Sequence, residues 1–253
     1  MINSEEELLE AKKHIIEVSR ELHDVGLLVR TWGNISQRID EKSFLITPSG
    51  IKYEDLTPEM IVKVNIDDLS FEGDIAPSSE KAVHAICYKL RKDVDFIVHT
   101  HQVYASCAGT LGMKKIKTYF SDDDIVIPVA AYALPGTQKL ADNVGKALLK
   151  YPDKKGFIMA NHGTICFGEN SKEAIFEAEK MEVACHNFLT DTCKTDMNHG
   201  VEVGYNSHLE NGEIVYDHND TPLRVRRIHE YIYSKRPDVN YIIHNNLGKM
   251  HYS

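Results

Sequence analysis

The sequence predicts an α/β protein with three layers, in which a central, mostly antiparallel sheet has helices on both faces. Short β-branched runs separated by turns follow one another closely between residues 31 and 71, as in an antiparallel meander. After residue 77, amphipathic segments of helical period alternate with short apolar runs typical of buried strands. A chain of 253 residues is long enough for one such domain and an appendage. We therefore expect a main domain over residues 1–200 and a C-terminal extension over 205–253.

The first helix is expected over residues 5–25. Ser4 and Glu7 form a capping box, apolar residues follow at helical spacing, and Gly26 is a typical helix stop. The next segment begins with a turn, and the turn Pro48-Ser49-Gly50 ends a later strand. Thr31–Ile39 is expected to be a turn that leads into a strand, and the other strands expected in this part of the chain are Ser43–Thr47, Ile61–Asn65 and Leu69–Phe71.

Helices and strands alternate in the remainder of the main domain. The segment Pro77-Ser78-Ser79-Glu80 is predicted to begin a helix with serine as its N-cap, and Thr137 and Ser171 are predicted to cap two longer helices. A short helix is expected after His101. The strands expected here are Phe96–Val98, Ile125–Val129, Phe157–Ala160 and Thr164–Phe167. Polar residues at the ends of these strands give the predicted sheet a polar edge.

Composition and charge exclude several classes of protein. The formal net charge of −9 argues against a nucleic-acid partner, which would need a basic surface. No apolar run approaches the length of a membrane span, and the acidic N-terminus lacks the pattern of a secretory signal peptide. The five cysteines are odd in number and include no C-x-x-C pair, which favours reduced thiols in a cytoplasmic protein.

Three histidines predict a metal site. His99 and His101 end an apolar strand, and residues two apart on a strand point to the same side. His162 follows another apolar strand and precedes Gly163, whose small size permits close approach. Three neutral imidazoles with an open coordination position are typical of catalytic zinc or of a similar divalent transition metal. The alternative is that these histidines make ordinary hydrogen bonds at the edge of the sheet.

Glu80 is the candidate acid or base. A glutamate at the start of a helix commonly complements the helix dipole and does nothing more. Beside a bound cation, the same carboxylate can ligate the metal or transfer a proton. His84 lies one turn further along the predicted helix, on the same face. We expect His84 to be a structural partner of this site and not a ligand.

Small polar residues at three turns predict an anion pocket. They are the pairs Gly33-Asn34, Ser49-Gly50 and Ser78-Ser79. Hydroxyl groups, an amide and the N–H groups at a helix N-terminus bind a phosphate without many basic side chains. Each pair alone is also an ordinary turn signal, which is the alternative interpretation.

The C-terminal extension resembles a degenerate copy of residues 60–108. Residues 227–246 align without a gap with residues 82–101, and the identical residues are His229, Tyr233, Arg236, Asp238, Val239, Ile242 and His244. In the copy, Val225 stands where the main domain has Glu80, and Asn246 stands where it has His101. We therefore predict no second active site. The alternative is two unrelated helix–strand units of similar composition.

The motifs together resemble those of the class II aldolase and adducin family, over roughly residues 5–195. The motifs that carry the resemblance are Gly33-Asn34-Ile35-Ser36, Ile46-Thr47-Pro48-Ser49-Gly50, Pro77-Ser78-Ser79-Glu80, His99-Thr100-His101 and Asn161-His162-Gly163. This resemblance implies a central antiparallel sheet flanked by helices. It also implies a homotetramer with active sites between neighbouring subunits.

The resemblance further assigns roles to the candidate residues. It implies Zn²⁺, or another divalent transition metal, held by His99, His101 and His162, with Glu80 as acid and base. It implies that the phosphate of a small sugar is bound by Gly33, Asn34, Ser49, Gly50, Ser78 and Ser79. A tyrosine usually completes the site in this family, and Tyr119 is the candidate here, although its surroundings match the family pattern poorly.

The reaction implied by the resemblance is cleavage of a small ketose phosphate through a metal-bound enediolate. The chain would then be an aldehyde-lyase of carbohydrate metabolism. Within the same family, a sugar-phosphate 4-epimerase and a sugar-acid phosphate decarboxylase are alternatives. A non-catalytic, adducin-like interaction module is a further alternative, which the presence of all three histidines and Glu80 disfavours. The extension would serve as an interface element or be the remnant of a longer ancestor.

Overall fold

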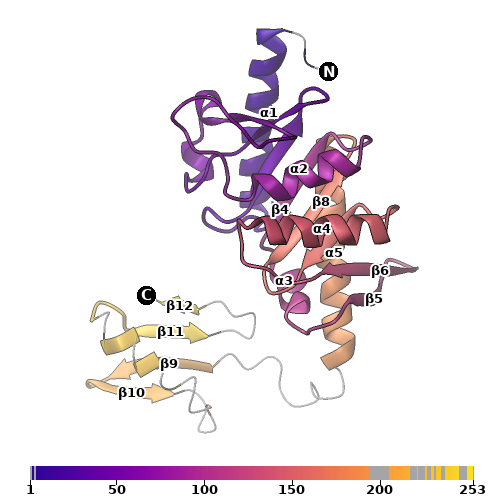
Figure 1. Cartoon of the computed structure of the whole chain (residues 1–253). Helices are drawn as coiled ribbons and strands as arrows, with labels where there is room; N and C mark the ends of the chain where they lie inside the picture. Colours follow the sequence, from indigo (N-terminus) through magenta and orange to yellow (C-terminus); the bar gives the residue numbers. More distant parts are fainter. Residues whose placement is uncertain are drawn as a thin grey trace. The chain divides into compact units, whose positions relative to one another are not determined.

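The computed structural model describes residues 2, 4–193, 205–216, 221, 226, 229–230, 232–234, 237–244 and 250–252. The chain divides into two compact units, Met1–Asp191 and Thr192–Ser253, which are described separately. Figure 1 shows the helices and the large sheet of the first unit and the small sheet of the second. None of the helices described is long and apolar enough to cross a bilayer.

The first unit is built on one eight-stranded sheet. Its strand order is β3-β2-β1-β4-β8-β7-β6-β5, and all neighbouring strands are antiparallel except β6 and β7. The strands are β1 (Asn34–Arg38), β2 (Ser43–Ile46), β3 (Val62–Asn65), β4 (Phe96–Thr100), β5 (Lys115–Phe120), β6 (Asp123–Ala130), β7 (Gly156–Met159) and β8 (Gly163–Gly168). This order places β4 in the middle of the sheet, between β1 and β8.

Helices cover both faces of this sheet, so the predicted α/β fold is confirmed. The helices are α1 (Glu5–Asp24), α2 (Lys81–Leu90), α3 (Val103–Gly109), α4 (Gln138–Lys150) and α5 (Ser171–Cys193), with short 3₁₀ turns at Tyr53–Asp55 and Pro58–Met60. Strand β4 contributes to both cores because successive side chains alternate. Phe96 and Val98 belong to the core that includes α1 and α5, whereas Ile97 belongs to the core that includes α2 and α4.

Two helix starts differ from the sequence-based expectation. Helix α2 has Glu80, not a serine, at its N-cap position, and the Glu80 side chain makes no capping hydrogen bond. Ser78 acts one step earlier, where its hydroxyl accepts the backbone N–H of Glu80 at 3.2 Å. Helix α5 begins at Ser171 itself, and Asn170 Oδ1 accepts the N–H of Glu173 at 3.0 Å. The cap therefore lies one residue before the serine that we predicted.

The strand predictions were wrong in two places. Leu69–Phe71 is not a strand, because Leu69 adopts a left-handed conformation with φ of 62° and Phe71 forms only an isolated bridge to Val64. Strand β5 was missed altogether. The strand β5 pairs with β6, which begins at Asp123 in an acidic stretch of low strand propensity. Because that stretch does not look like a strand, the hairpin of β5 and β6 is not evident from the sequence, and the pairing itself outweighs the low propensity.

The second unit contains a four-stranded antiparallel sheet of order β10-β9-β11-β12. Its strands are β9 (Tyr205–Glu210), β10 (Glu213–Tyr216), β11 (Tyr241–His244) and β12 (Met250–Tyr252). Val225 and Asn246, on which the prediction of a degenerate site depends, lie outside the described residues.

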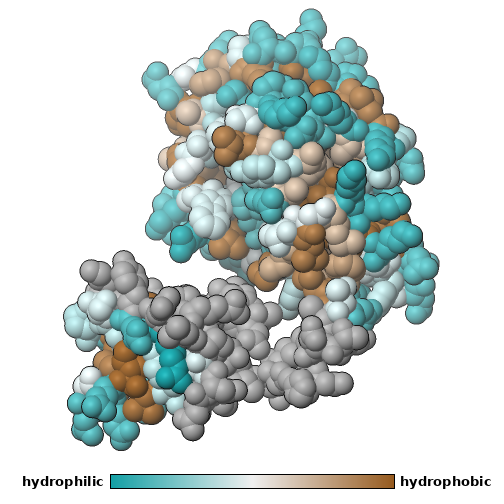
Figure 2. Space-filling model, turned by 60° about the horizontal axis from the view of Figure 1, so that its bottom comes forward, coloured by the Kyte–Doolittle hydropathy of each residue, from teal (hydrophilic) through white to brown (hydrophobic). Residues whose placement is uncertain are grey.

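In the view of Figure 2, the surface of the first unit is largely hydrophilic, with hydrophobic residues exposed in separate groups.

Arg38 on β1 stabilises the end of α2. Its Nε donates to Val94 O at 2.9 Å, and its Nη2 donates to Tyr88 O at 2.8 Å and to Arg91 O at 2.9 Å. We expect Arg38→Lys to lower the free energy of unfolding by about 2 kcal/mol, because one ammonium cannot reproduce this planar fork and leaves buried carbonyls unpaired. Urea denaturation followed by circular dichroism measures the change.

Lys52→Met is the matched control for this prediction. Lys52 pairs with Glu54 at the surface, where both side chains are about two-thirds exposed. The free energy of unfolding of the Lys52→Met variant should differ from that of the wild type by less than about 0.5 kcal/mol. Equal stabilities of the two variants would contradict the role assigned to Arg38.

Candidate metal centre

The first two histidines come from the end of β4. His99 is 1% exposed, and its Nδ1–H donates to Thr164 O on β8 at 2.7 Å, which leaves Nε2 as the available ligand atom. Thr100, between the two histidines, donates to Gln102 Oε1 at 2.6 Å and forms a second hydrogen bond with the Thr164 hydroxyl at 2.7 Å. His101 follows directly, so the end of a central strand fixes two imidazoles.

His162 lies in the turn that joins β7 to β8. Asn161 takes a left-handed conformation with φ of 55°, and the His162 N–H closes the turn onto Met159 O at 3.1 Å. Gly163 comes next and must be a glycine, because a Cβ there would lie 2.4 Å from Thr100 O and 3.3 Å from the His99 ring. The absence of a side chain at Gly163 therefore brings β8 close to β4 and His162 close to the other two rings.

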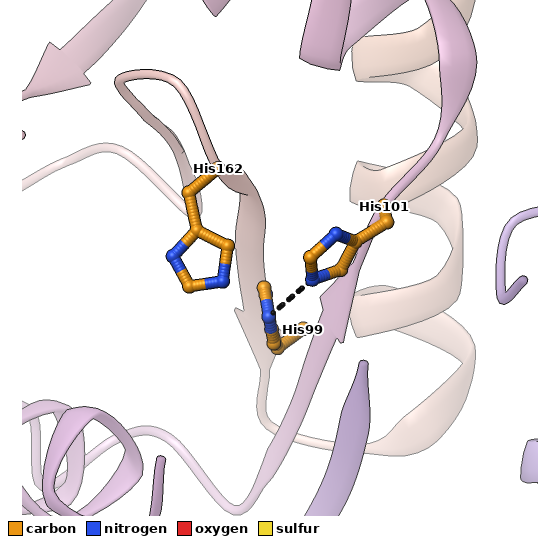
Figure 3. Close-up of side chains that lie close together, drawn as sticks. All are labelled: His99, His101 and His162. Carbon is orange, nitrogen blue, oxygen red and sulfur yellow. Dashed lines mark hydrogen bonds between the residues drawn. The ribbon is translucent and has the colours of Figure 1, made fainter. Parts of the chain in front are cut away.

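The three imidazoles converge as the sequence predicts (Figure 3). One ligand nitrogen from each ring lies within 4.8 Å of the others, and His99 Nε2 lies 3.0 Å from His101 Nε2. A cation about 2.1 Å from each nitrogen needs nitrogens about 3.4 Å apart, which such a cluster can provide. Three nitrogen donors, one of them fixed by its hydrogen bond to a carbonyl, fit a divalent transition metal with an open position.

Glu80 faces this cluster and not its own helix. Its Oε2 lies 2.7 Å from His99 Nε2, and its Oε1 lies 3.2 Å from His162 Nε2. The side chain is only 8% exposed. The alternative role for this residue, a charge that complements the helix dipole, does not explain why the carboxylate turns toward the histidines. Glu80 is therefore placed to ligate a cation or to exchange a proton beside it.

The electrostatics of the cluster favour the ionised form of Glu80. Burial would raise the pKa of Glu80, but His99 and then His162 outweigh burial and lower it. Burial would lower the pKa of His99, but Glu80 raises it. Burial lowers the pKa of His101 to about 3 and that of His162 to about 4, with charge on His99 as the second cause. The site thus demands one positive charge beside Glu80 and keeps two other imidazoles neutral, which suits a bound cation.

A cavity of about 540 Å³ opens onto Glu80, His101 and His162. All six residues of the predicted phosphate pocket also line it: Gly33, Asn34, Ser49, Gly50, Ser78 and Ser79. The two serine-containing segments lie side by side, because Pro48 and Pro77 form a bridge and the Ser78 N–H donates to Thr47 O at 3.1 Å. The structure therefore gathers the predicted residues at one end of the sheet.

The cavity also has walls that the sequence-based reasoning missed. They are Thr31, Trp32, Pro48, Pro135 and Asn161. Trp32 is 52% exposed and its ring centre lies 6.0 Å from that of His101. A tryptophan beside the motif Gly33-Asn34 was the available signal, because tryptophan is enriched where a protein binds a partner.

Tyr119 is not brought to this cavity. It lies on the edge strand β5, is 38% exposed, and is not one of the described residues that line the cavity of its own chain. Its backbone carbonyl accepts a hydrogen bond from Asn187 of α5 at 3.3 Å.

Comparisons with known proteins agree with the motifs. A family model described as Class II Aldolase and Adducin N-terminal domain matches residues 13–189. The 5-deoxy-D-ribulose 1-phosphate aldolase of Bacillus thuringiensis serovar kurstaki is 33% identical over 178 residues, which are 69% of this chain and 82% of that protein. The L-fuculose phosphate aldolase of Escherichia coli K12 is 33% identical over 187 residues, covering 73% of this chain and 85% of that protein.

A solved structure of an L-fuculose 1-phosphate aldolase superposes with a TM-score of 0.65 at 25% identity, covering 92% of this chain and 98% of the other. The L-fuculose-1-phosphate aldolase of Thermus thermophilus superposes with a TM-score of 0.60 at 23% identity, covering 74% and 98%. The second likeness concerns the fold alone. The chain therefore belongs to the class II aldolase and adducin family, and it is a metal-dependent lyase of the class II aldolase type.

Proposed function

We propose that this chain is a zinc-dependent aldolase that cleaves a small ketose phosphate into dihydroxyacetone phosphate and an aldehyde. The observation that carries the proposal is the convergence of three imidazole nitrogens within 4.8 Å, with the Glu80 carboxylate 2.7 Å from the first of them. The relatives named above act on L-fuculose phosphate and on 5-deoxy-D-ribulose 1-phosphate. A ketose 1-phosphate is therefore the first substrate class to test.

His99, His101 and His162 would hold the Zn²⁺ ion, which when bound polarises a ketose carbonyl and stabilises the negative charge released by carbon–carbon cleavage. Glu80 would transfer the proton: its carboxylate takes up the proton that the substrate hydroxyl loses as it becomes the aldehyde and gives it to the carbon that has lost its bond, and in the synthetic direction the carboxylate removes that proton from carbon. The buried position of Glu80 excludes bulk water from this exchange.

The phosphate would bind on the opposite wall of the cavity. Ser49, Gly50 and Ser79 are exposed there, next to the N-terminus of α2, whose partial positive charge favours an anion. No lysine or arginine is among the described residues that line the cavity, so we assign phosphate binding to hydroxyl and N–H groups.

We propose a homotetramer in the cytoplasm in which Tyr119 acts in the site of a neighbouring subunit. The support is an apolar hollow of about 410 Å³ beside β5, lined in part by Val25, Phe120, Phe176 and Val183. Exposed apolar area of this kind is typical of surfaces that a partner covers. Tyr119 directly precedes Phe120, whose ring lies 6.0 Å from that of Phe176. Tyr119 would relay the proton that the substrate hydroxyl loses as it becomes the aldehyde.

We also propose that the second unit is a non-catalytic copy of part of the first and serves as an interface element. The sequence supports this proposal because the copy has Val225 and Asn246 in place of the base and of one ligand.

His162→Ala should lower bound zinc well below one ion per chain and abolish cleavage, because two imidazoles hold the ion far less tightly than three. Metal analysis after dialysis and the release of dihydroxyacetone phosphate measure both effects. His23→Ala is the control, since His23 lies at the exposed end of α1. Undiminished zinc in His162→Ala would end the assignment of this ligand.

Glu80→Gln should retain zinc and lower kcat by about 10²–10⁴-fold, because an amide cannot carry the proton. The assay should follow released dihydroxyacetone phosphate, 4-epimerised sugar and carbon dioxide together. Formation of 4-epimerised sugar would replace the aldolase proposal by the epimerase alternative, and release of carbon dioxide would replace it by the decarboxylase alternative.

Phe176→Asp should reduce the number of subunits measured by light scattering, since it places a charge in the apolar hollow. Leu149→Asp is the matched control, because Leu149 on α4 is 70% exposed and does not line the hollow. An unchanged mass in Phe176→Asp would refute an interface at this surface.

A further inference from the structure

A continuous row of hydrogen bonds leads from the core to the candidate acid and base. Tyr88 OH lies 2.7 Å from Ser36 Oγ, which lies 2.6 Å from His84 Nδ1. On the other side of the ring, His84 Nε2 contacts Asn34 Oδ1. Asn34 Nδ2 then donates to Glu80 Oε2 at 3.3 Å. All five residues are buried, and Tyr88, Ser36 and His84 are fully enclosed, so these three groups depend on one another for their hydrogen bonds.

The direction of each hydrogen bond in this row follows from the chemistry of its members. The Asn34 amide presents its NH₂ group to Glu80 Oε2, so its oxygen faces His84 and can only accept from that ring. Burial lowers the pKa of His84 to about 3, so the ring is neutral and carries a single N–H. That proton must be on Nε2 to donate to Asn34, and Nδ1 then accepts from the Ser36 hydroxyl. Every donor therefore points toward Glu80.

This arrangement gives the two carboxylate oxygens of Glu80 different partners. Oε2 is held by the Asn34 amide, whereas Oε1 has no hydrogen-bond donor among the described residues and lies 3.2 Å from His162 Nε2. With a cation on the imidazoles, His99 Nε2 carries no proton, because its Nδ1–H is already donated to Thr164 O. The Asn34 amide is then the remaining donor that fixes the carboxylate, and Oε1 is the oxygen that exchanges protons.

The second unit repeats the contact between a serine, a histidine and a tyrosine. Ser207 Oγ lies 2.8 Å from His229 Nδ1 and 3.1 Å from Tyr233 OH. Ser207 pairs with Ile242 of the neighbouring strand, just as Ser36 pairs with Ile97. Two positions before Ser207, however, the sequence has Tyr205, whereas two positions before Ser36 it has Asn34. The serine–histidine–tyrosine contact thus recurs where the aligned sequence has Tyr205 in place of Asn34 and Val225 in place of Glu80.

We propose that His84 is a positioning residue that orients the Asn34 amide so that one oxygen of Glu80 is fixed and the other is free to exchange protons. This inference rests on the proposed function of Glu80. It gives the Asn34 side chain a task besides the phosphate binding that the resemblance implies, because both ends of its amide are engaged in this row.

His84→Leu should lower kcat roughly 10-fold or more while KM and bound zinc stay unchanged, because outer partners of a site commonly contribute 10–100-fold. His84→Gln should keep kcat within about 3-fold, since the Gln amide N–H can donate to Asn34 from near the position of the imidazole Nε2. His229→Leu loses the same serine contact in the second unit and should leave kcat unchanged. Equal kcat in the wild type and His84→Leu, or equal losses in the Leu and Gln variants, would overturn the proposal.

A second measurement needs neither activity nor a folded variant. Long-range ¹H–¹⁵N correlation spectra of the zinc-free wild type, labelled in histidine, report which ring nitrogen of His84 is protonated. We expect Nε2–H, and Nδ1–H would overturn the proposal because Asn34 would then have no donor for its oxygen. If the wild type cleaves no ketose phosphate, the proposed function fails, whereas this spectrum still decides how the Asn34 amide is oriented.

Discussion

Glu80 is buried, and an ionised carboxylate loses several kcal/mol of hydration when it is buried without a positive partner. Two kinds of neighbouring group offset the lost hydration of Glu80. The imidazoles of His99 and His162 approach its two oxygens, and the Asn34 amide donates to one of them. Glu80 raises the pKa of His99, which favours a proton on that ring in the metal-free protein. In the enzyme, a cation among the three rings would supply the positive charge. The cation that balances the charge of Glu80 would then be the same cation that the proposed reaction uses.

The backbone of the sheet provides the precision that this arrangement needs. A Cβ at Gly33 would lie 2.5 Å from His99 O, and one at Gly163 would lie 2.4 Å from Thr100 O. Both neighbours of β4 can therefore approach it closely only because these residues lack side chains. The hydrogen bonds that His99 and Thr100 form with Thr164 then fix the ends of β4 and β8 together. Ligands on strands held in this way need little rearrangement to bind an ion.

The serine–histidine–tyrosine contact occurs in both units, which indicates that it stabilises the packing of a helix on a strand whether or not a reacting group lies nearby. In both units a serine on one strand meets a histidine and a tyrosine one helical turn apart. In the first unit the neighbouring amide connects this contact to Glu80, and our proposals give it a part in proton transfer. One short contact can thus stabilise a strand–helix unit and also be extended toward a reacting group.

Sequence alone determined the fold class and most element positions, and it singled out the three histidines and six turn residues that the structure gathers at one end of the sheet, because periodicity, caps and strand-end histidines are local signals. It missed β5 and misplaced two helix caps, since strand pairing and the packing of Ser78 and Asn170 outweigh local propensity. Only the tertiary structure decided that Glu80 faces the histidines, that His84 reaches it through Asn34 and that Trp32 borders the cavity. These contacts join residues far apart in the chain, and no local pattern encodes such distances.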